Sequence, residues 1–118
     1  MENIYTISLM LDFYGQLLTK RQYEMLDLHY NSDFSLGEIA EQLDISRQGV
    51  FDNIRRAKAI LYEFEEKLRL VARFSEQKVR FKSLLQDINS IDLTPLEVKD
   101  KDVISKVKEG IISIIDGI

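Results

Sequence analysis

Apolar residues recur along this chain at steps of three and four, the spacing that places side chains on one face of an α-helix. A first stripe runs through residues 4–18 and is widened by further apolar positions, so we expect a largely buried N-terminal helix. The stripe consists of Ile4, Ile7, Leu11, Tyr14 and Leu18, and the residues that widen it are Leu9, Met10, Phe13 and Leu17. Five glycines and one proline in 118 residues are few turn formers, which favours helices joined by short loops over a many-stranded β-fold. The sequence therefore predicts an all-α protein.

Three helix starts follow, each marked by a side chain that can cap free backbone amides. The caps are Thr19 with Gln22, Ser35 with Glu38, and Ser46. The helix after the last cap has an apolar stripe of Val50, Ile54, Ala57 and Leu61. Short helices that are joined by a tight turn, each with its own cap, describe a helix-turn-helix. We expect its core over residues 17–61, with additional helices on both sides.

Residues 62–118 predict a C-terminal helical extension. The apolar stripe changes phase by one residue near 72–75, so residues 54–91 form either one bent helix or, as we favour, two helices. The Thr-Pro pair at 94–95 predicts a helix start or a capped turn. The large apolar residues of the last helix must be covered, either by the rest of the domain or by a second subunit. They are Val103, Ile104, Val107, Ile111, Ile112, Ile114, Ile115 and Ile118. We expect them to hold a homodimer.

The inventory of reactive residues argues against an enzyme. The chain has no cysteine and one histidine, His29, so we predict no catalytic residue, no metal site and no cofactor. The clustered Glu63, Glu65 and Glu66 are interpreted as a solvated helix face. The N-terminus lacks the basic region of a signal peptide, and no apolar run approaches the roughly 18 residues of a membrane span. We expect a cytoplasmic protein without membrane insertion, and its length fits a single helical domain over residues 1–118.

Net charge is −4, but two basic segments stand out within the acidic chain. Residues 47–58 hold four basic and one acidic residue, and residues 67–82 hold six and one. The first segment supplies the candidate contacts to a nucleic acid or protein partner, namely Arg47, Gln48, Phe51, Asn53, Arg55 and Arg56. The second supplies a secondary basic face of Arg69, Arg73 and Arg80. The alternative for both segments is an ordinary solvated helix face, and for Phe51 an intramolecular or intersubunit contact.

Asp52 falls in the middle of the outward face of the third helix of this motif. An aspartate repels phosphate and accepts a hydrogen bond from only one base, cytosine. At spacings of three and four residues it can engage Arg55 and Arg56 instead. Direct reading of a DNA sequence by this face is therefore disfavoured.

Two segments carry a resemblance to known families. Residues 17–26 and 35–46 resemble region 4 of bacterial sigma factors. The closer similarity is to the YlxM family of helix-turn-helix proteins associated with the signal recognition particle, and it includes Phe13 and Tyr14, residues 46–56, and residues 63–68. This resemblance implies a bacterial, all-helical regulatory protein without known catalysis. It implies the RNA or the GTPase of the signal recognition particle as the partner, with duplex DNA and transcriptional regulation as the alternative.

Overall fold

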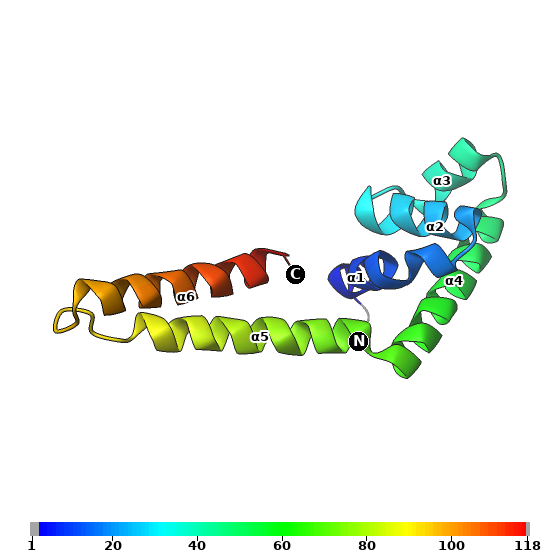
Figure 1. The fold of residues 1–118 in the computed structure, drawn as a ribbon. Coiled ribbons are helices and arrows are strands. Elements are labelled where there is room, and N and C mark those ends of the chain that lie inside the picture. Colours follow the sequence, from blue (N-terminus) through cyan, green and yellow to red (C-terminus); the bar gives the residue numbers. More distant parts are fainter. Residues whose placement is uncertain (1–2, 118) are drawn as a thin grey trace. The chain divides into compact units, whose positions relative to one another are not determined.

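The chain is almost entirely helical in this computed structural model, which describes residues 3–117. Its elements in order are α1 (Ile4–Tyr14), the 3₁₀ turn η1 (Gly15–Leu17), α2 (Lys20–Leu26), the π-helical turn η2 (Asp27–Asn31), α3 (Leu36–Leu43), α4 (Arg47–Leu68), α5 (Leu70–Asn89) and α6 (Val98–Gly117) (Figure 1). The described residues contain no β-strand, and the prediction of an all-α fold is confirmed. The chain divides into two compact units, the first ending at Val71 and the second beginning at Ala72.

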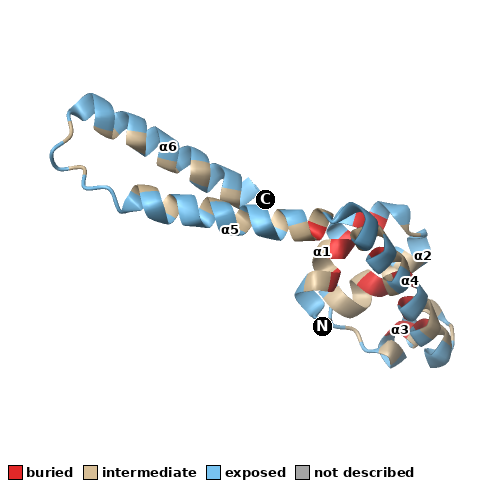
Figure 2. Cartoon of the chain, turned by 90° about the horizontal axis from the view of Figure 1, so that it is seen from below, coloured by how far each residue is buried: buried red, intermediate tan, exposed pale blue. Residues whose placement is uncertain are grey.

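The first unit is organised around α4, against which α1, α2 and α3 pack. Its interior contains the predicted stripe of α4 and the inner faces of the other three helices, and Figure 2 shows these residues in red. The buried residues are Ile7, Met10, Leu11, Tyr14, Met25, Leu26, Ile39, Val50, Ile54, Ala57, Leu61 and Val71. The prediction of a largely buried first helix is wrong for Ile4, Phe13 and Leu17, which are exposed. Only one face of α1 meets α4, and the helix gives way to η1 before Leu17.

All three predicted caps are present. In the first capping box the Gln22 amide donates to Thr19 Oγ1 at 3.1 Å, and the Thr19 amide donates to Gln22 Oε1 at 3.0 Å. Ser35 and Glu38 make the same reciprocal pair, in which the Ser35 amide holds the pKa of Glu38 below its ordinary value. Ser46 Oγ accepts from the Gly49 amide at 2.9 Å and starts α4. The helix starts are therefore set by local chemistry, as the sequence predicts.

The helix that starts after Thr19 is less regular than its sequence pattern indicates. It changes from α2 into the π-helical turn η2, in which Asn31 donates to the Asp27 carboxylate and accepts from the Ser8 hydroxyl of α1. His29 in this turn lies edge-on to the Tyr30 ring, and its Nδ1 lies 2.8 Å from the Phe34 carbonyl oxygen. A carbonyl oxygen only accepts, so Nδ1 carries the proton. His29 therefore has a packing role in this turn.

The boundary between α4 and α5 lies at Arg69, which has a left-handed backbone with φ of 55°. Two helices are present, as we favour from the sequence, but the break comes before the predicted 72–75. Glu65 Oε1 accepts from the Tyr14 hydroxyl at 2.6 Å and from the Val71 amide at 3.0 Å, while Tyr14 Oη accepts from the Leu70 amide at 3.0 Å. These bonds satisfy the first two amides of α5. The interpretation of Glu65 as part of a solvated face is wrong, because its carboxylate caps this helix.

The second unit is a hairpin of α5 and α6, which run side by side in Figures 1 and 2. Residues 90–97 connect them, and α6 begins at Val98. Pro95 thus lies in a turn, one of the two alternatives predicted for the Thr-Pro pair. No side chain among the described residues of this unit is buried. In the first unit α4 continues through residues 62–68, and the buried core ends at Val71.

Gly15 is required by space at the junction of α1 and η1. A Cβ atom at this position would lie 2.7 Å from Cε2 of the Tyr23 ring. We expect Gly15→Ala to lower the free energy of unfolding by ~1–2 kcal/mol, as overpacking displaces the ring. Gly37→Ala is the matched control, since its Cβ would meet only Ser35 Oγ at 3.9 Å and alanine favours the helix. Equal stability of the two variants in thermal unfolding would contradict a steric requirement for glycine at Gly15.

Candidate nucleic-acid interface

The candidate interface is formed by the first three turns of α4. Three residues, Asp44 to Ser46, separate α3 from α4, and the left-handed Asp44 (φ 56°) ends α3. Because Val50, Ile54, Ala57 and Leu61 face the core, the opposite side of α4 is turned to solvent. This arrangement is the helix-turn-helix that the sequence predicts, with α4 in the position of the recognition helix.

Asp52 is the centre of the polar contacts on the exposed face of α4. Its Oδ1 accepts from Gln48 Nε2 at 3.2 Å and lies 3.9 Å from Arg55 Nη2. Arg56 does not reach the carboxylate, and its Nε instead donates to the Asp52 carbonyl oxygen at 3.4 Å. The predicted engagement of Asp52 is therefore confirmed for Arg55 alone. The contact with Gln48 was not predicted, although its four-residue spacing is a recognisable signal.

The other candidate residues of α4 differ in what they offer a partner. Asn53 is half-buried and donates from Nδ2 to the Gly49 carbonyl oxygen at 2.8 Å, so this donor is already engaged within the helix. Phe51 is 47% exposed, and Arg47 is exposed at the first position of the helix. The side chain of Arg55 is 70% exposed. The face thus combines exposed cations with an exposed aromatic ring.

The secondary basic face does not lie on a single helix. Arg69 occupies the left-handed position between α4 and α5, whereas Arg73 and Arg80 are exposed on α5, seven residues apart. The lysines of the same segment are also divided, with Lys67 on α4 and Lys78 over the Phe74 ring at 5.7 Å. The break at Arg69 therefore separates Lys67 from the basic residues of α5.

Comparison with known proteins identifies the family of this chain. Residues 1–109 match the family described as "Putative helix-turn-helix protein, YlxM / p13 like" (UPF0122). A UPF0122 protein of Acetivibrio thermocellus is 54% identical over 116 residues, which cover 98% of this chain and 99% of the relative. The UPF0122 protein YlxM of Bacillus subtilis is 46% identical over 84 residues, covering 71% of this chain and 76% of the relative. This chain belongs to the YlxM / p13-like family.

The YlxM / p13-like family is described as a helix-turn-helix family. The described residues contain no cluster of three or more His, Asp or Glu side chains suited to a metal ion. In the same part of the chain, no helix has both the length and the apolar character needed to cross a membrane.

Proposed function

We propose that this YlxM / p13-like protein is a non-enzymatic regulator that binds structured RNA through the exposed face of α4. The proposed partner is the RNA of the signal recognition particle, in keeping with the resemblance drawn from the sequence. Arg55 and Arg56 contact backbone phosphates in this proposal, and Phe51 stacks on an unpaired base. Arg47 and Gln48 extend the contact at the start of the helix.

The observation that carries this proposal is the position of Asp52. Its carboxylate already accepts from Gln48 and lies beside Arg55, and these are the two side chains best suited to read base edges. Specific reading of a DNA duplex would require Gln48 and Arg55 to leave Asp52. It would also place the negative charge of Asp52 in the major groove of the DNA. Phosphate contacts from the outer nitrogen atoms of the arginines leave the Gln48 contact in place, and the charge of Asp52 weakens them without preventing them. An exposed aromatic ring beside them suits an unpaired base.

A DNA-binding transcription regulator is the second candidate, because the α3–turn–α4 arrangement is that of a DNA-reading motif. The GTPase of the signal recognition particle is the third. The three candidate partners differ in how their affinity for this protein depends on salt and on sequence. They are an RNA recognised by phosphate contact and stacking, an operator recognised by its base sequence, and a protein surface. One set of titrations therefore separates them.

The test is a titration of the full chain against signal recognition particle RNA, mixed genomic duplex DNA and the particle's GTPase, each at several salt concentrations. We expect the RNA to bind most tightly. In Arg55→Glu with Arg56→Glu, we expect the affinity for RNA to fall roughly tenfold or more, since two charge-assisted contacts are lost. The slope of log affinity against log salt should also become shallower by about 1.5 to 2.

The matched control is Lys99→Glu with Lys106→Glu, which makes the same change in net charge at exposed positions of α6. It should retain most of the affinity. Asp52→Asn is the second probe, and it should strengthen binding to every nucleic acid a few-fold without creating a sequence preference. Unchanged RNA affinity in the folded Arg55 and Arg56 variant would overturn the proposal. Preference for one duplex sequence would favour the transcription regulator, and binding to the GTPase alone would favour the protein adaptor.

A further inference from the structure

The hairpin of α5 and α6 has one seam between its two helices, and further large apolar side chains beside that seam are exposed. The half-buried residues recur at heptad spacing and form the seam between the two helices. They are Phe74, Lys78, Phe81, Leu85 and Ile88 on α5, and Lys101, Ile104, Lys108, Ile111 and Ile115 on α6. Because none of these side chains is buried, the hairpin lacks an interior of its own.

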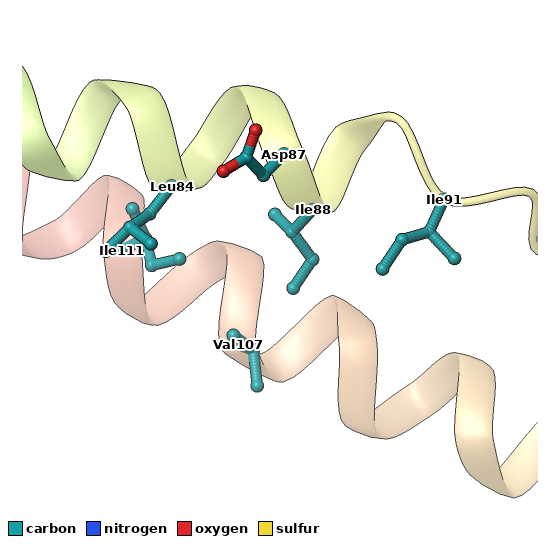
Figure 3. Close-up of a pocket in the computed structure, with 6 residues that line it drawn as sticks. All are labelled: Leu84, Asp87, Ile88, Ile91, Val107 and Ile111. Atoms are coloured by element: carbon teal, nitrogen blue, oxygen red, sulfur yellow. The ribbon is translucent and has the colours of Figure 1, made fainter.

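A groove that is lined in part by these exposed side chains runs along one side of this hairpin. One hollow, of about 270 Å³, is lined by Gln77, Arg80, Phe81 and Leu84. The next, of about 460 Å³, is lined by Leu84, Asp87, Ile88, Ile91, Val107 and Ile111 (Figure 3). Leu84 lines both hollows. Figure 3 shows Ile88 pointing into the space between the helices.

Three large apolar side chains on this groove are about half exposed to solvent. Leu84 is 51% exposed, Ile91 is 46% and Val107 is 45%. On α6, two further exposed apolar residues, Val103 and Ile114, lie at heptad spacing from Val107. A second apolar row beside an occupied seam, as on α6, is typical of four-helix bundles, in which each helix packs against two neighbours.

The charges on the groove match a second copy of the same surface. Arg80 and Asp87 line the groove on either side of Leu84, four residues before it and three after it. If a second α5 runs antiparallel and crosses at Leu84, each Arg80 lies opposite Asp87 of the other copy. A two-fold symmetric contact requires this self-complementarity, because the same patch meets itself.

We propose that two copies of this chain dimerise through the groove, forming an antiparallel four-helix bundle with the two-fold axis at Leu84. Leu84 packs against its symmetry mate, and two Arg80–Asp87 pairs flank it. The exposed residues Val103, Val107 and Ile114 are covered together with them. Dimer contacts thus fall on α5 as well as α6, and Arg80 serves the dimer and not the RNA. This proposal does not depend on the proposed function.

The test is the oligomeric state of the full chain without nucleic acid, measured by sedimentation equilibrium at about 1–100 µM, where a weak dimer is detectable. We expect a dimer, and Leu84→Glu should raise its dissociation constant by ~30-fold or more, as expected for a central anchor. Val79→Glu is the matched control, because Val79 is 67% exposed on α5 and lines neither of these two hollows. Helical geometry places it on another face of α5 from Leu84, where it lines a different hollow with Ser75 and Glu76. It should change the dissociation constant by less than about threefold.

Charge reversal tests the antiparallel register itself. Arg80→Glu alone and Asp87→Arg alone each place like charges opposite one another twice per dimer, and each should weaken the dimer by roughly five- to tenfold at low salt. Combining them restores opposite charges, so the double variant should return to within about threefold of the original. Circular dichroism confirms that each variant keeps its helices. A monomeric original protein, a larger assembly, equal effects of Leu84→Glu and Val79→Glu, or no restoration in the double variant would each overturn the proposal.

Discussion

Leu61→Ala should lower the free energy of unfolding of the first unit by ~2–5 kcal/mol. Leu61 is fully buried on the core face of α4, in the same cluster as Ala57 and Val71. Removing its branched end leaves a cavity that the surrounding helices fill only in part, and the lost contacts add to the lost burial. The measurement is urea unfolding followed by the near-ultraviolet signal of tyrosine. All five tyrosines lie between Tyr5 and Tyr62 and the chain has no tryptophan, so this signal reports on the first unit alone.

Leu68→Ala is the matched control, because Leu68 is on the same helix and in the same heptad position of the sequence pattern. It is 47% exposed, and its truncation should cost less than about 1 kcal/mol. All variants are compared at one protein concentration, so that any self-association affects them alike. Equal costs for the two substitutions would mean that α4 is not packed as described.

Tyr14→Phe should lower the free energy of unfolding by ~1–3 kcal/mol, although the ring is retained. The phenol donates to Glu65 Oε1 and accepts from the Leu70 amide, so phenylalanine leaves that amide without its partner at the start of α5. The ring itself stacks on Phe64 with centroids 5.9 Å apart, and this contact survives the substitution. The cost therefore belongs to the hydrogen bonds that hold the α4–α5 boundary.

The same network predicts a dependence on alkaline pH. Burial and the hydrogen bond to Glu65 raise the pKa of Tyr14 above its ordinary value of 10.0. A group whose pKa is raised in the folded state keeps its full stabilising contribution below the unfolded pKa and loses it as pH rises through the folded pKa. The original protein should therefore lose stability above about pH 10 more steeply than Tyr14→Phe.

Tyr5→Phe is the control for this comparison, because Tyr5 is 54% exposed. Thermal unfolding of the three proteins between about pH 7 and 11 gives the required profiles. Tyr5→Phe should retain both the stability and the steep alkaline loss of the original protein. A Tyr14→Phe profile that runs parallel to the original would rule out Tyr14 as the source of the effect.

The helix-turn-helix was predictable because its determinants are close together in the sequence. Each capping pair spans three residues, and the α4 stripe from Val50 to Leu61 follows directly from helical periodicity. The position of Asp52 among Gln48 and Arg55 follows from the same periodicity. The candidate site was predictable to this extent, and the contacts it makes with a partner remain predictions.

The sequence by itself determined the all-α class, the helix starts and the outward face of α4, because these depend on neighbours within one or two helical turns. Tertiary structure decided where α4 ends, since the residue that fixes this boundary, Tyr14, is 51 positions away from Glu65 and 56 from Leu70. It also decided that Leu61 is buried while Leu68, in an equivalent heptad position, is exposed. Periodicity gives the direction of a side chain around its helix axis, but burial depends on which other segment packs there.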